Sequence, residues 1–365
     1  MDHQGRQKKL KESLIRNRMD ALLISHLPNI RYLCGFTGSA GALLLTGTKS
    51  VLFTDGRYTA QARAEVQAAR IVIGSKAPLL AAAEWLAANH KSLGLKGPQR
   101  VGIEGEHVTV AGRSRLASIL PHKFRLREAP ALVEQARMVK DSAEIERIRA
   151  AVVLGASLFD RALRTIHPGV RETEVAAEME YAARRAGAQE MSFPTIIASG
   201  ERSALPHGRA SEAAIPPQGF VVCDFGVILA GYCSDMTRTL YVGRPTAEAR
   251  RLYQAVREAQ QAAVEAVKPG VSAGEVDRAA RKLLQKKGLG KYFTHSTGHG
   301  VGLEIHEAPR LAAGQAEILR PGMVITIEPG MYIPRKWGVR IEDMVLVTER
   351  GCEVLTPTSK ELNAV

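Results

Sequence analysis

The sequence has few features of a secreted or membrane-spanning protein. No apolar run approaches the roughly 20 residues needed to span a bilayer. The first twenty residues are charged throughout and contain no apolar core of a signal peptide. The cysteines form no CxxC pair and do not suggest a disulfide framework; they are Cys34, Cys223, Cys233 and Cys352. We therefore expect a cytoplasmic protein that has no membrane partner.

The charge balance is basic, but the sequence has no nucleic-acid-binding motif. The formal net charge of +13 could indicate a nucleic-acid partner. However, the lysines and arginines occur in short clusters between acidic residues, such as RQKKLK and LLQKKGLGK. We interpret them as a solvated basic surface and expect no nucleic-acid partner.

The chain of 365 residues is long enough for about two domains of roughly 150 residues each. From residue 21 onward, short apolar runs alternate with Ala-rich helical stretches at 59–70 and 77–93, which predicts an α/β domain. The pattern breaks at Pro130, and the sequence DSAE at 141–144 then provides a capping box for a long helix. We place one domain over 1–132 and a second over 133–365.

The second domain contains a faint duplication. The PGV segment at 168–170 recurs at 269–271, and Gly187 and Gly288 share the same offset of 101 residues. Each copy then continues into strand-like sequence. Chance similarity around the PGV turns is the alternative explanation. A duplication predicts a pseudo-symmetric α+β domain in which antiparallel strands face each other across a central site.

Acidic residues inside apolar strand-like runs are the most informative anomaly of the sequence. Asp224 lies in FVVCDFG and Glu328 in MVITIEPG, where an unpaired carboxylate is costly and needs a cationic partner. Asp235 and Glu342 follow 11 and 14 residues later, a separation that a hairpin can span. His299 lies in the Gly-rich segment HSTGHGVGLEIHE, where the backbone can approach a site closely.

Four carboxylates and one imidazole suit divalent cations such as Mn²⁺, Co²⁺ or Zn²⁺. Two such ions would balance four negative charges, and a pair about 3.5–4 Å apart can activate a bridging water and polarise a carbonyl. Each residue alone has a simpler explanation, for example Glu342 as an ion-pair partner of Arg340. Together they predict a two-metal hydrolytic centre.

Further polar residues lie near these five in the sequence. His207 lies in SGERSALPHG, and His306 follows His299 by seven residues. Either imidazole could bind a substrate carbonyl or a developing oxyanion. Arg340 precedes the last carboxylate by two residues, on the same strand face, and could orient a ligand. His295 could support a ligand or contact the substrate.

These motifs resemble those of the pita-bread metallopeptidases, specifically the Xaa-Pro aminopeptidases and the Xaa-Pro dipeptidases (prolidases). The matching segments cover most of residues 140–356 in order; they are FPTIIASGERSALPHG, CDFGVILAGYCSDMTRT, HSTGHGVGLEIHEAPR, ITIEPGMYIP and VRIEDMVLVTERG. The first half is similar to the creatinase-like N-terminal domain of that family, in NIRYLCGFTGSAGALLL and LFTDGRYTAQA. The resemblance implies this N-terminal domain followed by a pita-bread catalytic domain.

The resemblance also implies roles for the five candidate ligands. Asp224 would chelate one metal, His299 and Glu328 would bind the other, and Asp235 and Glu342 would bridge the two. Glu328 would in addition relay the proton of the metal-bridging hydroxide. The implied metal is most often Mn²⁺.

The same resemblance implies the substrate and the assembly. The scissile bond would be the one before proline, in short peptides with proline at the second position. His207 and His306 match substrate-binding and transition-state-stabilising histidines, and Arg340 matches an arginine beside the last ligand. Members of the family usually form homodimers or homotetramers.

The choice between the two peptidase types depends on weaker features. The segments GFTGSAG and TDGRYTAQA look more like the shorter aminopeptidases, so we expect an Xaa-Pro aminopeptidase. Arg310 in HEAPR could receive the free carboxylate of a dipeptide, which supports the alternative of an Xaa-Pro dipeptidase. Creatinases and non-catalytic pita-bread binding modules lack the full ligand set, so the intact set argues against both.

Overall fold

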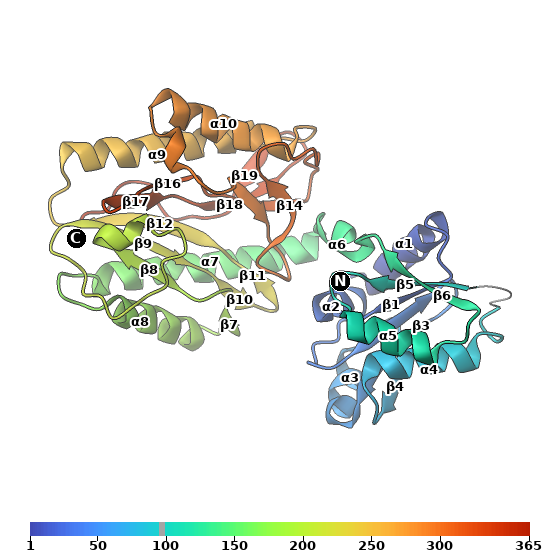
Figure 1. Ribbon diagram of the computed structural model, residues 1–365. Helices are drawn as coiled ribbons and strands as arrows, with labels where there is room; N and C mark the ends of the chain where they lie inside the picture. Colours follow the sequence, from blue (N-terminus) through green and yellow to red (C-terminus); the bar gives the residue numbers. More distant parts are fainter. Residues whose placement is uncertain (95–98) are drawn as a thin grey trace. The chain divides into compact units, whose positions relative to one another are not determined.

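The computed structural model describes residues 1–94 and 99–365 (Figure 1). The chain divides into two compact units, Met1–Arg137 and Met138–Val365. The boundary expected between residues 132 and 133 falls at the start of helix α6 (Leu132–Arg137), and the structural division comes at the end of that helix. Helix α6 belongs to the first unit because Glu134 and Arg137 both hydrogen-bond the buried Asn29 of that unit.

The first unit is an α/β domain, as the alternating pattern predicts. Its sheet has the order β4-β3-β2-β1-β5-β6; β1, β2 and β3 pair antiparallel, and the outer pairs are parallel. The strands are β1 (Ala21–Ile24), β2 (Ala42–Thr46), β3 (Ser50–Asp55), β4 (Arg70–Gly74), β5 (Gln99–Glu104) and β6 (Phe124–Ala129). Besides α6, its helices are α1 (His3–Arg16), α2 (Leu27–Cys34), α3 (Thr59–Glu65), α4 (Pro78–Asn89) and α5 (Val110–Ile119).

The second unit contains two helix pairs, α7 (Ser142–Thr165) with α8 (Glu172–Arg185), and α9 (Ala247–Ala266) with α10 (Ala273–Lys286). Adding 101 to the bounds of α8 gives those of α10, and adding 101 to the last residue of α7 gives that of α9. The PGV turns between the helices also match, since the two glycines have φ values of +88° and +85°. The pseudo-symmetric α+β domain is therefore confirmed.

Antiparallel strands lie between the two helix pairs (Figure 1). Two of the sheets have the orders β12-β9-β8 and β14-β13-β15-β18-β19, and smaller groups of strands have the orders β11-β10-β7 and β16-β17. In chain order the strands are β7 (Glu190–Met191), β8 (Ile196–Ser199), β9 (Gly219–Phe225), β10 (Val227–Leu229), β11 (Tyr232–Cys233), β12 (Met236–Val242), β13 (Gly298–Gly300), β14 (Glu307–Leu311), β15 (Val324–Ile327), β16 (Gly330–Ile333), β17 (Trp337–Arg340), β18 (Asp343–Val347) and β19 (Cys352–Val354).

Each helix pair covers one of these sheets with an apolar core. Val221, Cys223 and Phe225 of β9 pack in the cluster that contains α7 and α8, whereas Ile325 and Ile327 of β15 pack in the cluster that contains α9 and α10. Since strand side chains alternate between faces, the residues between them point away from the helices. Two sheets can in this way present polar side chains to a shared interior.

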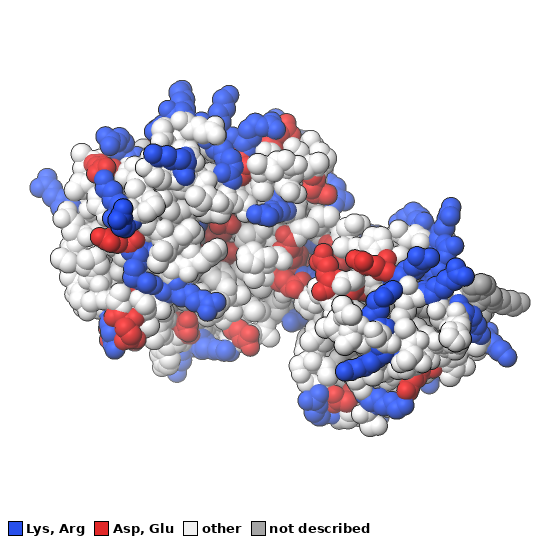
Figure 2. Space-filling view, in the orientation of Figure 1, with Lys and Arg blue, Asp and Glu red and all other residues white. Residues whose placement is uncertain are grey.

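Other sequence-based expectations concern the surface and the cysteines. On the face in Figure 2, lysine and arginine side chains are scattered over each unit with acidic side chains between them. The four cysteines are free thiols. Within the described ranges 1–94 and 99–365, no helix has the length and apolarity that crossing a membrane requires.

Candidate metal centre

All ten residues singled out from the sequence line one cavity of about 670 Å³ in the second unit. The five candidate ligands come from the sheets that contain β9 and β15, or from residues adjoining the strands of these sheets. Asp224 lies in β9, Asp235 directly before β12, His299 in the middle of β13, Glu328 directly after β15, and Glu342 directly before β18.

Strand alternation explains why these carboxylates meet. Cys223 and Phe225 face the helices, so Asp224 between them faces the interior. Glu328 follows Ile327 in the same way, since Ile327 packs against the other helix pair. The two halves of the duplication therefore each contribute acidic groups to one cavity.

Three of the ligand side chains converge on one point. One ligand atom each from Asp235, His299 and Glu342 lie within 4.8 Å of one another. The Nε2 atom of His299 is 3.6 Å from Asp235 Oδ2 and 3.5 Å from Glu328 Oε1. Its Nδ1 atom lies 3.0 Å from the carbonyl oxygen of Gly300, so the tautomer that donates there leaves Nε2 free to bind a metal.

Burial and like charge make this cluster costly in the absence of a cation. Burial, and then the neighbouring carboxylates, raise the pKa of Asp235 and that of Glu342 well above their usual range. Burial raises the pKa of Glu328 to about 7, and Asp224 adds to that shift. Burial and the nearby His306 lower the pKa of His299 to about 4, so its imidazole is neutral at pH 7.

The residues present fit a divalent metal. The Oδ1 atom of Asp224 is buried and has no hydrogen-bond partner among the described residues. Its Oδ2 atom accepts a bond from Arg340 at 2.5 Å. An unsatisfied buried carboxylate oxygen facing other carboxylates and a neutral imidazole is the donor set that Mn²⁺, Co²⁺ or Zn²⁺ binds.

A hydrogen-bond chain connects the ligands to their surroundings. Arg340, which is buried, also donates to the Tyr332 hydroxyl at 2.6 Å and to Thr237 Oγ1 at 3.1 Å. The hydroxyl of Thr237 in turn donates to Glu342 Oε2 at 2.7 Å. His295 Nε2 lies 2.9 Å from the Tyr332 hydroxyl, so His295 lines the cavity and also supports this chain. Burial lowers the pKa of His295 to about 4.

Tyr332 and Thr237 are supporting residues that the sequence reasoning missed. Tyr332 lies in the β16–β17 hairpin, whose other strand ends at Arg340. Thr237 is two residues after Asp235, in the quoted segment CSDMTRT. Both lie in segments that resemble the family, but only the strand pairing shows what their hydroxyls contact.

The remaining predicted residues form the exposed part of the cavity. His207, His306 and Arg310 are exposed, and the ring of His306 meets that of His299 edge-on with centroids 4.4 Å apart. Burial, followed by the nearby His207, lowers the pKa of His306. Arg310 pairs with His299 in the β13–β14 ladder. The wall has further residues that were not anticipated, among them Phe193, Pro194, Arg209 and Ile305.

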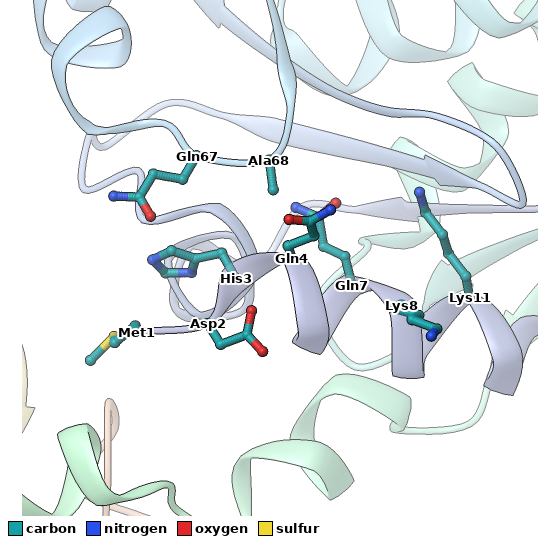
Figure 3. A pocket seen from close by; sticks show the side chains of 9 residues that line it. All are labelled: Met1, Asp2, His3, Gln4, Gln7, Lys8, Lys11, Gln67 and Ala68. Atoms are coloured by element: carbon teal, nitrogen blue, oxygen red, sulfur yellow. The ribbon is translucent and has the colours of Figure 1, made fainter.

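A second cavity, in the first unit, has a different character (Figure 3). It measures about 640 Å³, and its lining includes Asp2, His3, Lys8 and Lys11. Its carboxylate, that of Asp2, caps helix α1 by accepting a bond from the Gly5 amide. The acidic cavity of the second unit is therefore the candidate metal centre.

Comparisons with known proteins identify the family of the chain. Residues 146–349 match the model of metallopeptidase family M24, and residues 6–139 match the creatinase/prolidase N-terminal domain. The Xaa-Pro dipeptidase of Pyrococcus horikoshii is 39% identical over 97% of each chain. A solved structure of an Xaa-Pro dipeptidase from Bacillus anthracis is 39% identical, covers 100% of both chains and has a TM-score of 0.93.

An X-Pro aminopeptidase structure from Thermotoga maritima is also similar, with 36% identity, a TM-score of 0.87, and coverage of 97% of this chain and 99% of the other. The two family models together span both structural units, and the solved structures share the whole fold. The chain therefore belongs to metallopeptidase family M24, with a creatinase/prolidase N-terminal domain before a pita-bread catalytic domain.

Proposed function

We propose that this protein is a two-metal Xaa-Pro dipeptidase. The observation that carries the proposal is the convergence, in one cavity, of the five metal-ligand candidates, two histidines and Arg310. The sequence favoured an aminopeptidase, and that preference is not confirmed. Relatives that match nearly the whole chain are named Xaa-Pro dipeptidases, which supports the alternative.

The cage would hold two divalent ions, with Mn²⁺ as the proposed metal. Its members are Asp224, Asp235, His299, Glu328 and Glu342. When bound, such ions supply Lewis acidity toward the peptide carbonyl and lower the pKa of water. Their charge would also offset the burial and the repulsion between carboxylates that raise the pKa of Asp235, Glu328 and Glu342 in the metal-free protein.

Glu328 is the residue best placed to move a proton. Its carboxylate lies in the cage, with Oε1 3.5 Å from His299 Nε2, where it could accept a proton from an attacking water and return it. The nitrogen of a bond before proline has no hydrogen, and it must gain one before it leaves as the free imino acid. We assign that transfer to Glu328.

His306 and His207 would orient the substrate. Both are exposed to the cavity, and the lowered pKa of His306 favours a neutral ring that can hydrogen-bond the peptide carbonyl. Phe193, Pro194 and Ile305 provide apolar surface in the same cavity, which suits a proline ring.

Arg310 would bind the free carboxylate of the substrate. A dipeptide has its free carboxylate immediately after proline, close to the scissile bond. Arg310 is exposed, lines the cavity and pairs with the ligand strand at His299, so it can reach a carboxylate held near the metals. A longer peptide has a neutral amide at that point and would leave the guanidinium without its partner.

A second candidate, the Xaa-Pro aminopeptidase, is favoured by the similarity to the Thermotoga maritima enzyme. Peptide length separates the two. We expect the Mn²⁺-loaded protein to hydrolyse Ala-Pro about 10- to 150-fold more efficiently, in kcat/KM, than Ala-Pro-Ala, because a hydrogen bond to a charged group contributes about 1.5–3 kcal/mol.

Variants test the role of Arg310. Arg310→Met should lower kcat/KM for Ala-Pro by about 10- to 100-fold and leave the slow hydrolysis of Ala-Pro-amide unchanged, since the amide lacks the carboxylate. Arg209→Met is the matched control, since it removes another arginine from the same cavity. Equal turnover of Ala-Pro and Ala-Pro-Ala would establish the aminopeptidase instead.

A further inference from the structure

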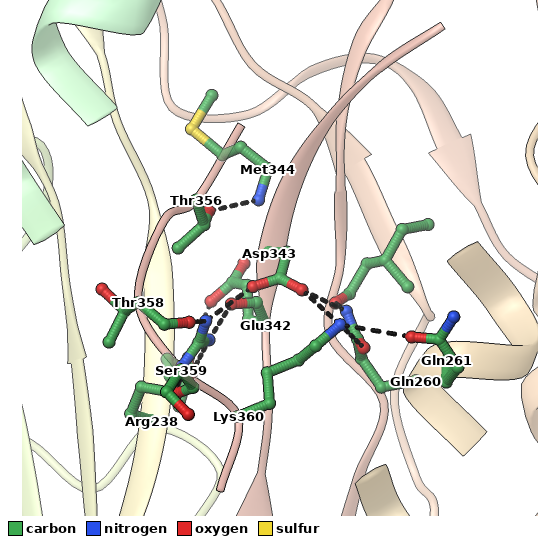
Figure 4. A network of polar contacts seen from close by, with 12 residues as sticks. Arg238, Gln260, Gln261, Glu342, Asp343, Met344, Thr356, Thr358, Ser359 and Lys360 are labelled. Atoms are coloured by element: carbon green, nitrogen blue, oxygen red, sulfur yellow. Dashed lines mark hydrogen bonds and ion pairs between the residues drawn. The ribbon is translucent and has the colours of Figure 1, made fainter. Parts of the chain in front are cut away.

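A buried polar network lies directly behind one of the candidate ligands (Figure 4). Glu342 and Asp343 are adjacent, so their side chains point to opposite faces of the strand. Glu342 faces the metal cavity, whereas Asp343 faces helix α9 and the C-terminal segment. Asp343 is 1% exposed and accepts from Arg238 on one oxygen and from Gln260 and Lys360 on the other.

Among the described residues Arg238 is the largest fully buried side chain, and all its donors are used. A guanidinium has five N–H groups. Nε donates to the carbonyl of Ser359 at 3.0 Å. One Nη donates to the carbonyls of Thr237 and Glu342, and the other to Asp343 Oδ1 and the carbonyl of Thr358.

These bonds act on the backbone of the metal cage. The Glu342 amide donates to the carbonyl of Thr237 at 3.1 Å, and the Thr237 hydroxyl donates to Glu342 Oε2. Arg238 therefore donates to the carbonyls of both Thr237 and Glu342, the two residues whose hydrogen bonds to each other fix the Glu342 carboxylate. Gln260 extends the same network to the carbonyl of Ile327, which immediately precedes the ligand Glu328.

The C-terminal segment completes the network. The carbonyls of Thr358 and Ser359 accept from Arg238, and the Lys360 ammonium lies 3.0 Å from Asp343 Oδ2 and 2.9 Å from Gln260 Oε1. Helix α9 also holds the segment, because the hydroxyl of its buried residue Tyr253 donates to the carbonyl of Lys360 at 3.1 Å. Lys360 therefore contacts Asp343, the neighbour of the candidate ligand Glu342. Thr358 and Ser359 accept from Arg238, which in turn donates to the carbonyl of Glu342.

We propose that Arg238, clamped by Asp343 and by residues 358–360, is a positioning residue that fixes Glu342 and thereby sets the metal affinity of the centre. The inference rests on the metal ligands named under the proposed function. The reason is geometric: four of the five donors of Arg238 hold main-chain carbonyls in fixed places, and one of these belongs to Glu342 itself. A lysine has three donors on one atom and cannot reproduce this fork.

Metal binding by the full chain tests the proposal without any use of activity. Mn²⁺ is titrated calorimetrically into chelator-stripped protein, and folding is checked by circular dichroism. Arg238→Lys keeps the charge and should raise the Kd for Mn²⁺ by about 10- to 100-fold, the range expected when residues that orient metal ligands are replaced. Lys360→Met removes the ammonium that contacts Asp343 and Gln260, and it should raise the Kd for Mn²⁺ by a smaller factor.

Tyr253→Phe is the matched control. It removes the bonds from the Tyr253 hydroxyl to the carbonyls of Lys360 and Glu361 but leaves the hydrogen bonds of Arg238 and Asp343 in place, so we expect a lower Tm with an unchanged Kd. An Arg238→Lys protein that folds and binds Mn²⁺ like the wild type overturns the proposal, as does a Tyr253→Phe protein with the same loss of affinity. If Arg238→Lys does not fold, an unchanged Kd in Lys360→Met overturns it. A wild-type chain that binds no Mn²⁺ contradicts the proposed function as well.

Discussion

At the scale of single residues, the proposed metal centre is a set of side chains whose burial is costly without a cation. Asp235 and Glu342 are buried beside other carboxylates, and Asp224 has an oxygen for which the described residues provide no donor. A protein core does not normally accept such a cluster. Arg340 compensates part of the charge through Asp224, and bound cations would compensate more of it.

Removal of one carboxylate charge should therefore disrupt the centre. Asp235→Asn keeps the shape of the side chain but removes a candidate bridging ligand, so we expect loss of bound Mn²⁺ and at least about a hundredfold fall in Ala-Pro hydrolysis. Metal analysis and a peptidase assay check this. Asp160→Asn, at an exposed position of α7, is the control and should change neither. Wild-type metal content in Asp235→Asn would contradict the proposed cage.

Metal affinity should fall as the pH is lowered through neutrality. The pKa of Glu328, about 7, is raised from its ordinary value, so the metal-free protein holds a proton there at pH 6 and has lost it at pH 8. A metal must displace that proton, which weakens binding about tenfold between pH 8 and pH 6 for this group alone. The raised pKa values of Asp235 and Glu342 act in the same direction.

Calorimetric titration of Mn²⁺ at the two pH values measures this effect. His299 adds no slope in that range, because its pKa of about 4 keeps the imidazole neutral. Binding that is equal at both pH values, or tighter at pH 6, would show that the carboxylates do not hold protons in the metal-free protein.

Sequence reasoning placed ten residues in this cavity but not all of their partners. Carboxylates such as Asp224 stand out because they interrupt apolar runs. Tyr332 and Thr237 do not stand out, since a tyrosine or threonine is ordinary in a strand. The Tyr332 contact with Arg340 depends on how the β16–β17 hairpin turns, and the Thr237 contact joins residues 103 apart, and the sequence pattern specifies neither.

At the scale of elements, the site depends on short strands that approach each other closely. Gly298 and Gly300 flank His299 in β13. A Cβ atom on Gly298 would collide with the main-chain carbonyl of Thr326, and one on Gly300 with that of Ala308. The glycines are therefore needed for the pairing of β13 with its neighbours, which sets the position of the imidazole.

Gly298→Ala should for this reason be destabilising. Overpacking of this kind costs about 1–3 kcal/mol, which lowers Tm by about 2–12 °C in a unit of this size. Thermal unfolding measures the change, and the Kd for Mn²⁺ should rise because His299 is displaced. Gly351→Ala is the control, because a Cβ there meets nothing within 4 Å and φ is not positive. Equal Tm values for the two variants would contradict the packing argument.

The sequence predicted helices better where they are capped than where they merely contain alanine. The capping box at Asp141 starts α7 as expected, with Glu144 reaching back to the Asp141 amide. By contrast, the helix expected over 59–70 ends at Glu65. Val66 is extended, the Gln67 amide bonds the carbonyl of Cys34, and Ala68 has φ of +58°. Tertiary contact here overrides local propensity.

At the scale of the whole molecule, the chain has two units with separate cores, and all five candidate ligands belong to one of them. The duplication in the second unit explains how carboxylates from distant segments meet, and the constant offset of 101 residues made that part of the architecture predictable. The unit boundary was less predictable, because α6 is assigned to the first unit by its hydrogen bonds to Asn29 rather than by its sequence.

This separation predicts a selective effect of metal on unfolding. A ligand at a hundred times its Kd stabilises the state that binds it by about 2.7 kcal/mol, which raises Tm by about 5–11 °C in a unit of 150–250 residues. Since the cage lies within 138–365, Mn²⁺ should shift the unfolding transition of that unit and leave the transition of 1–137 in place. Scanning calorimetry of the full chain with and without Mn²⁺ measures both transitions. The Asp235→Asn variant should show no shift, and a metal-dependent shift of both transitions together would show that the units unfold as one.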